Sequence, residues 1–174
     1  MIVYVAAPFS RAADARRAMV LLQAAGHEIA RDWTVASDEF TACGDAPAEV
    51  RARHAGENLA AVLAADAFLL LTFDPHAGGY DALQNPRLSV ERYAVSQVGR
   101  GCHSELGAAL CAQGATCDDE RPYRVLVCGP DREANAFALL AERYETLEDA
   151  VFALGIGDGP PTSTPTPTSP GVDR

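Results

Sequence analysis

The sequence predicts an α/β protein: a doubly wound parallel sheet of about five strands with helices on both faces. Apolar, strand-like segments alternate along the chain with segments of helical period. Residues 67–73 (AFLLLTF) are apolar on both faces, which is typical of a central strand in a parallel sheet. This alternation favours a flavodoxin-like arrangement, in which ligands bind at the carboxyl ends of the strands.

The first half of the chain supplies the other early elements. Residues 2–7 (IVYVAA) form an apolar opening strand, and residues 27–33 form a shorter, more polar strand near an edge of the sheet. A helix is expected over residues 11–25, with Ser10 as its N-cap, and a second helix over residues 48–64.

The second half continues the same alternation. A glycine-rich turn runs into an apolar helix at residues 99–110, and a fourth strand is expected at residues 124–128. A helix over residues 133–142, a brief strand near Tyr144 and a helix over residues 147–154 complete the expected order.

One domain is expected over residues 1–154. A chain of 174 residues that is 48% hydrophobic buries one full core. Residues 155–174 are rich in Pro, Thr, Ser and Gly, which predicts a disordered tail. Residues 74–99 form a long insertion without clear period, which is typical of a functional lid or a poorly ordered loop.

The charge balance narrows the class of partner. The formal net charge is −10, and an acidic surface of this kind argues against binding nucleic-acid polymers or anionic membranes. All 14 basic residues are arginine, which suits bidentate phosphate contacts. No apolar run reaches transmembrane length and no signal-like segment is present, so a cytoplasmic location is expected. The five cysteines show no C-x-x-C spacing, so no metal site is predicted.

The stretch GRGCHSELG at residues 99–107 is the most informative for chemistry. It predicts a helix capped by His103 or Ser104, with Glu105 in the first turn. Free backbone N–H groups at that end favour the charged form of Glu105, which keeps the carboxylate available as a nucleophile. A surface glutamate that complements the helix dipole is the alternative, and this stretch alone favours that alternative.

Four segments in a fixed order carry a resemblance over residues 1–154. They are IVYVAAPF at the start, Asn58 with Asp66 eight residues later, SELG at 104–107, and GPDREANAF at 129–137. Together they resemble the nucleoside 2-deoxyribosyltransferase family, which includes nucleotide N-glycoside hydrolases. The likeness is closest to short bacterial and phage-type members.

The resemblance implies cleavage of the N-glycosidic bond of a (deoxy)nucleoside or its 5′-monophosphate through a covalent glycosyl-Glu105 intermediate. The sugar then passes to another nucleobase or to water, and no cofactor takes part. Tyr4 matches a tyrosine that orients the glutamate, with a core aromatic as the alternative. Asn135 matches an asparagine that reaches into a neighbouring subunit's site, which implies a homodimer or a higher homo-oligomer; an ordinary helix-start asparagine is the alternative.

Asn58 stands where the family usually has an aspartate. An amide holds a hydroxyl group but does not serve as a general acid. Candidates to replace the acid are Glu57, Asp66, Asp74, Asp81 and His103. A residue such as Asp66 is more often structural, at a helix-to-strand junction, and a histidine such as His103 is more often a hydrogen-bonded helix cap.

Four further residues are candidates for substrate binding. Ser10 and Arg11 begin a helix after the first strand, which suits a 5′-phosphate. Phe9 and Trp33 are candidates for stacking on a base. The alternatives are a serine N-cap with a solvated arginine, and aromatic packing at strand ends.

Asn58 and the long insertion also motivate a different class of function: a catalytically inactive nucleotide-binding sensor or regulatory module with the same fold. A structural domain without a ligand is the third interpretation. The sequence does not separate transfer from hydrolysis.

Overall fold

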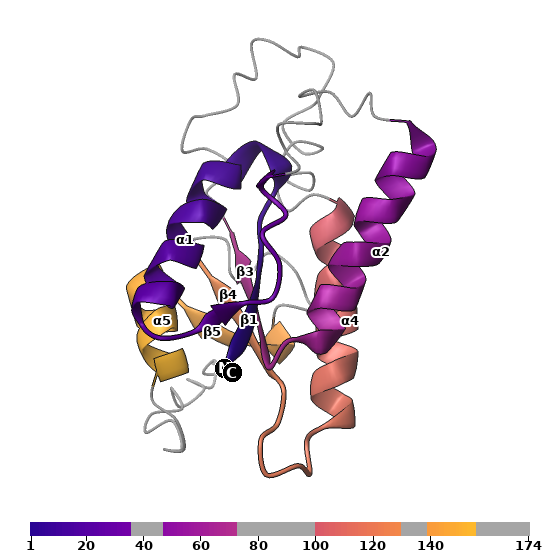
Figure 1. Cartoon of the computed structure of the whole chain (residues 1–174). Coiled ribbons are helices and arrows are strands. Elements are labelled where there is room, and N and C mark those ends of the chain that lie inside the picture. Colours follow the sequence, from indigo (N-terminus) through magenta and orange to yellow (C-terminus); the bar gives the residue numbers. More distant parts are fainter. Residues whose placement is uncertain (36–46, 73–99, 130–138, 156–174) are drawn as a thin grey trace, which may run out of the picture.

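A computed structural model of the chain describes residues 1–35, 47–72, 100–129 and 139–155 (Figure 1). Its strands are β1 (Ile2–Ala6), β2 (Glu28–Ile29), β3 (Ala67–Leu71), β4 (Arg124–Cys128) and β5 (Glu142–Tyr144). All neighbouring strands run parallel, in the order β2-β1-β3-β4-β5. This order is the flavodoxin-like one, with its switch point at β1 and β3. The predicted fold class is confirmed.

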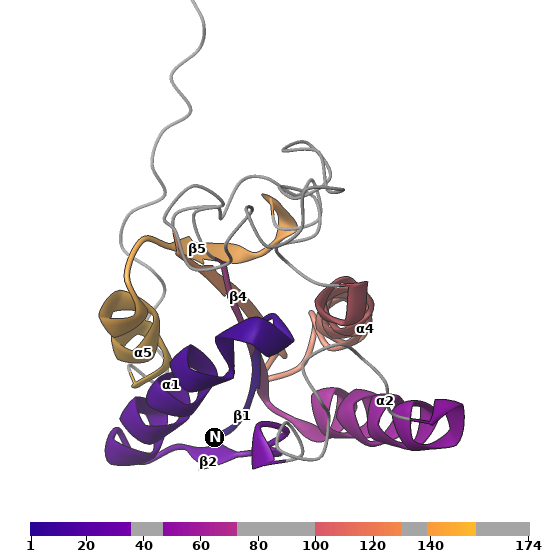
Figure 2. The ribbon, with the colours of Figure 1, turned by 90° about the horizontal axis from the view of Figure 1, so that it is seen from above.

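Helices cover both faces of this sheet. They are the 3₁₀ turn η1 (Phe9–Arg11) and the α-helices α1 (Ala12–Ala24), α2 (Ala48–Ala64), α4 (Arg100–Ala115) and α5 (Leu147–Gly155). Figure 2 shows α1 and α5 on one side of the sheet, and α2 and α4 on the other. A sheet covered in this way buries its central strands on both faces, which explains the uninterrupted apolar sequence of β3.

The core is centred on β1 and β3. Every residue of β3 is at most 5% exposed. Tyr4 of β1 and Phe68 of β3 are partners in the parallel register, and their rings stack with centroids 6.0 Å apart. The phenol of Tyr4 lies between the sheet and helices α2 and α4, which cover this face.

The prediction that Ser10 caps the first helix is wrong. Pro8 begins a 3₁₀ turn, in which the Arg11 amide donates to the Pro8 carbonyl at 2.8 Å. The α-helix proper follows at Ala12, with Arg11 in the N-cap position and no side-chain cap. Ser10 lies inside the preceding turn, so it does not occupy the capping position.

The predicted cap of the helix that carries Glu105 is also wrong. This helix, α4, begins at Arg100, so His103 and Ser104 lie inside it and Glu105 is in its second turn. Cys102 is 5% exposed one turn before the buried Leu106. Burial of Cys102 extends the apolar stripe, and with it the helix, toward the N-terminus.

The second strand is much shorter than expected, because only Glu28 and Ile29 pair with β1. The chain turns soon afterwards, where the Thr34 amide donates to Asp32 Oδ1 at 2.9 Å in an Asx-type turn. The expected position of β2 at an edge is confirmed.

Glu142 belongs to β5, whereas the sequence prediction placed it at the end of a helix over residues 133–142. Its carboxylate accepts two hydrogen bonds from the Arg124 guanidinium, at 2.8 and 2.7 Å. This bidentate pair joins β5 to β4 at the edge of the sheet. Residues 133–138 of the predicted helix lie outside the described residues.

Gly129 gives a test of the fold, because it follows β4 with φ of 120°, and a Cβ there would lie 2.2 Å from the Thr72 carbonyl oxygen. Gly129→Ala is expected to lower the free energy of unfolding by roughly 2–4 kcal/mol through backbone strain and this clash. Urea denaturation measures the change.

Gly107→Ala is the matched control. Gly107 lies in α4 with open space at its Cβ position, so alanine should stabilise the helix by about 0.5–1 kcal/mol. Equal midpoints for the wild type and Gly129→Ala would contradict the tight turn after β4.

Candidate active site

The helical period of α4 carries a carboxylate into the protein interior. Cys102, Glu105, Leu106 and Ala109 are its buried positions at the start of the helix, and they follow the i, i+3, i+4, i+7 spacing. Glu105 is only 9% exposed. A charged residue therefore occupies a position that the period of α4 assigns to the core.

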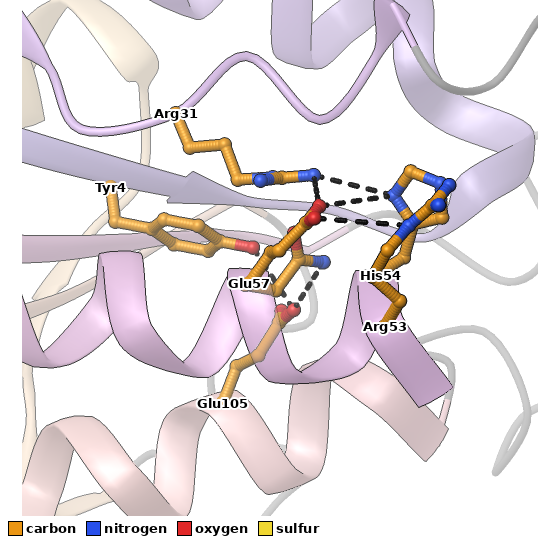
Figure 3. Close-up of polar contacts among 7 residues, drawn as sticks. Tyr4, Arg31, Arg53, His54, Glu57 and Glu105 are labelled. Atoms are coloured by element: carbon orange, nitrogen blue, oxygen red, sulfur yellow. Dashed lines mark hydrogen bonds and ion pairs between the residues drawn. The ribbon is translucent and has the colours of Figure 1, made fainter. Parts of the chain in front are cut away.

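Two side chains from other elements donate to this carboxylate (Figure 3). The Tyr4 hydroxyl of β1 donates to Glu105 Oε1 at 3.0 Å, and the Asn58 amide of α2 donates to the same oxygen at 3.2 Å. Both hydrogen bonds end on one oxygen, so Oε2 takes part in neither. The site joins β1, α2 and α4 at one carboxyl group.

Burial raises the pKa of Glu105, while the hydrogen bonds from Tyr4 and Asn58 oppose that rise. The sequence predicted the opposite net direction, with a helix end favouring the anion. Because α4 begins at Arg100, the amides around Glu105 lie beyond the first orphan N–H groups of the helix. Two side-chain donors, rather than the helix end, stabilise the ionised form.

The neighbours of Glu105 on its buried side are neutral. Burial raises the pKa of the Tyr4 phenol, and the Glu105 carboxylate raises it further. Burial and the same carboxylate raise the pKa of the Cys102 thiol. Tyr4 therefore remains a hydrogen-bond donor at neutral pH, and Cys102 remains a thiol.

The inward stripe of α2 is polar in its first half and apolar in its second. His54, Glu57 and Asn58 are partly buried, and they are followed at helical spacing by Ala61 and Val62. Polar residues at the core-facing positions of a helix indicate a site. The sequence contains this signal, but it becomes specific only when α2 is placed against α4.

Arg31 links this polar stripe to the sheet. Its Nη2 donates to Glu57 Oε2 and lies 3.3 Å from His54 Nδ1. In Figure 3, the Arg31 side chain extends toward His54 and Glu57 of α2 from the segment that follows β2. Neither Arg31 nor His54 was predicted from the sequence, because neither has a neighbour in sequence that marks a site.

Glu57, one of the candidates for a general acid, is poorly suited to that role. The hydrogen bond from Arg31 holds the pKa of Glu57 below its usual range, although burial opposes this effect. A carboxyl group that stays ionised accepts hydrogen bonds and does not protonate a leaving group near neutral pH.

The structure does not bring Asp66 or His103 to Glu105. Asp66 Oδ2 accepts a hydrogen bond from the Ile2 amide at 2.6 Å, at the amino ends of β1 and β3. Ligands of this fold bind at the opposite edge, so Asp66 here joins two strands. His103 is exposed, and its place two residues before Glu105 puts it on nearly the opposite side of α4.

Trp33 packs in the hydrophobic core and is only 5% exposed. Its indole N–H donates to the Val5 carbonyl at 2.7 Å, and its ring lies 5.6 Å from that of Phe9. With its N–H satisfied and its ring covered, Trp33 is not placed to stack on a base. Phe9 is half-exposed near the carboxyl end of β1, where it remains a candidate.

The guanidinium of Arg11 pairs with Asp14 at 2.8 Å, one turn further along. The two side chains are 36% and 42% exposed, although the pairing Nε atom of Arg11 is itself buried. Ser10 lies in η1 beside it. Asn135, Asp74, Asp81 and residues 156–174 of the tail lie outside the described residues. The roles predicted for them therefore stay predictions, as does the domain boundary at residue 154.

Within the described residues, no group of three or more His, Cys, Asp or Glu side chains is arranged to hold a metal ion. None of the helices in these ranges is both long enough and apolar enough to cross a membrane.

No protein-family model matches this sequence, and no curated protein does. Among solved structures, the chain is similar to a conserved protein from Enterococcus faecalis, with 17% sequence identity and a TM-score of 0.45. The match covers 87% of this chain and 95% of that one. The fold is established by the strand order β2-β1-β3-β4-β5 itself.

Glu105→Gln tests the energetic cost of the buried carboxylate. Glutamine keeps a carbonyl oxygen that accepts from Tyr4 and Asn58, and it removes the charge. At neutral pH the variant should therefore gain about 0.5–2 kcal/mol in the free energy of unfolding. Chemical denaturation at several pH values measures the difference.

The sign of the pH dependence follows from the raised pKa of Glu105. Between the unfolded and folded pKa values the folded wild type binds the extra proton, so its stability falls as pH rises through this window. The gain from glutamine should disappear below the ordinary glutamate value of about 4.3. A gain independent of pH, or a loss at neutral pH, would contradict this account.

Proposed function

We propose that this protein cleaves the N-glycosidic bond of a nucleoside or its 5′-monophosphate, with Glu105 as the nucleophile. The observation that carries the proposal is the pair of hydrogen bonds from Tyr4 and Asn58 to Glu105 Oε1. They fix a buried carboxylate by one oxygen and leave Oε2 for attack. The resemblance to the nucleoside 2-deoxyribosyltransferase family supports the same assignment.

The reaction has two displacements. In the first, Oε2 forms a bond to the anomeric carbon while the carbon–nitrogen bond breaks, and its electron pair leaves with the base, which takes up a proton. In the second, a nitrogen of another base or the oxygen of water attacks the anomeric carbon. Glu105 leaves as the carboxylate, and the acceptor loses a proton.

The surroundings of Glu105 suit this role. A carboxylate with little water around it is less stabilised by solvation, and it interacts more strongly with positive charge that develops on the sugar. The hydrogen bonds from Tyr4 and Asn58 favour its ionised form against the effect of burial, and they limit its rotation. Neither donor is itself an acid at neutral pH, so their contribution is to position the nucleophile.

Three further points stay predictions. A homodimer or a higher oligomer would bring Asn135 of one subunit to the site of another. The substrate is a nucleoside or nucleotide, without a cofactor. A cytoplasmic location is expected from the sequence.

Glu105→Ala should abolish base release. The assay exposes the purified protein to ribo- and deoxyribonucleosides and their monophosphates, with and without a second free base, and separates the products by liquid chromatography. The loss should exceed about 1000-fold, because the nucleophile itself is removed. Glu120→Ala, at an exposed position after α4, is the matched control and should keep full activity.

Mass spectrometry of the intact wild type during turnover should show a glycosyl adduct that the Glu105→Ala variant lacks. Full activity of Glu105→Ala would overturn the mechanism. Tight nucleotide binding by folded wild type without any base release would favour the inactive binding module instead.

Tyr4→Phe should change the pH profile. The Tyr4 hydrogen bond lowers the pKa of Glu105, so its removal raises that pKa, and the acid limb of kcat/KM moves to higher pH. At neutral pH the rate should fall by roughly tenfold or more, because a hydrogen bond to a charged group is lost. Tyr144→Phe removes a hydroxyl that bonds Glu142 and is the control. An acid limb that stays in place would show that Tyr4 does not act on Glu105.

A further inference from the structure

The amide nitrogen of Asn58 makes a hydrogen bond, whereas its amide oxygen is buried with no partner among the described residues. Its Nδ2 donates to Glu105 Oε1 at 3.2 Å. Its Oδ1 is buried and accepts no hydrogen bond from the described residues. A polar atom in this state beside a candidate nucleophile is a rare arrangement in folded proteins.

The orientation of this amide follows from its neighbour. The carboxylate oxygen of Glu105 only accepts, so the NH₂ group of Asn58 has to face it. The carbonyl oxygen then faces the other way, because the two heteroatoms share one planar carbon. Turning the amide over would set two acceptors against each other, which is unfavourable.

The unpaired oxygen calls for a donor that arrives with a ligand. Burying an acceptor without a hydrogen bond is unfavourable, and a bound hydroxyl group removes this cost. An amide that donates to Glu105 and accepts from the ligand at the same time also polarises its own N–H group. Ligand binding thereby strengthens the contact that holds the nucleophile.

The position of Oδ1 selects which hydroxyl this is. Only the amide carbon separates Oδ1 from the Nδ2 atom that contacts Glu105 Oε1, so the acceptor lies beside the reacting carboxylate. When the anomeric carbon of a sugar meets Oε2, its two ring neighbours are the ring oxygen and carbon 2. The ring oxygen carries no hydrogen, so the nearest donor is a hydroxyl group on carbon 2.

We propose that Asn58 Oδ1 accepts a hydrogen bond from the 2-hydroxyl of the sugar, and that the protein prefers ribonucleosides or ribonucleotides to their 2-deoxy counterparts. This inference rests on the proposed function, because it uses the placement of the anomeric carbon at Glu105. It names the sugar, which the proposed function leaves open.

The experiment compares affinities rather than rates, because an electron-withdrawing 2-hydroxyl by itself slows cleavage of the glycosidic bond. Glu105→Gln keeps the acceptor for Tyr4 and Asn58 without the nucleophilic anion, so binding is measured without turnover. Calorimetry determines the dissociation constants of ribonucleoside 5′-monophosphates and their 2′-deoxy pairs, for Glu105→Gln alone and combined with Asn58→Ala.

In Glu105→Gln, the ribo form of the bound nucleotide should bind about tenfold or more tightly than its deoxy pair. Adding Asn58→Ala should bring that ratio close to one. Adding Leu63→Ala instead, at an exposed position of α2, should leave the ratio unchanged. If Asn58 only positions Glu105, Asn58→Ala will change the dissociation constants of the ribo and deoxy nucleotides by the same factor.

Equal affinities, a deoxy preference, or a ratio that survives Asn58→Ala would overturn the inference. Base release by the wild type is measured in parallel. Base release with equal affinities overturns the sugar preference and leaves the proposed function intact. A ribo preference that Asn58→Ala removes, without base release, overturns the proposed function and supports the hydroxyl contact. No binding by any pair overturns both.

Discussion

The site depends on one constraint: a carboxylate buried in the core needs hydrogen-bond donors in place before any substrate arrives. Glu105 is carried inward by the same period that buries Cys102 and Leu106. Its charge is tolerable there because Tyr4 and Asn58 both donate to it. These donors come from β1 and α2, so the position of three elements is tied to one carboxyl group.

The arrangement continues outward from this carboxylate. On α2, Asn58 directly follows Glu57. Arg31 contacts both Glu57 and His54 of this helix. Arg31 stands just after the edge strand β2, so the ion pair fastens α2 to the sheet near Asn58. A helix that turns polar residues inward buries less apolar surface and is less stable for that reason. Such local losses of stability are common at functional sites.

Several elements were predictable because local pattern and tertiary environment agree. The apolar run in β3 is stable as a central parallel strand, because both of its faces are then buried. The helix predicted over residues 48–64 is confirmed as α2. Predictions failed where a tertiary contact overrode a local signal. The burial of Cys102 moved the start of α4 back to Arg100, and the Asp32 turn ended β2 after two residues. The indole N–H of Trp33 donates to the Val5 carbonyl and its ring packs against Phe9, so Trp33 is not available to stack on a base.

By itself, the sequence determined the doubly wound fold and singled out Glu105, because period and composition are local properties that one chain displays directly. Only the tertiary structure decided what Glu105 experiences. Tyr4 and Asn58 lie 101 and 47 residues away from it along the chain, and a pairing at that range depends on how β1, α2 and α4 pack. The same packing raised the pKa of Glu105, because desolvation is a property of the folded interior and cannot be read from neighbours in sequence.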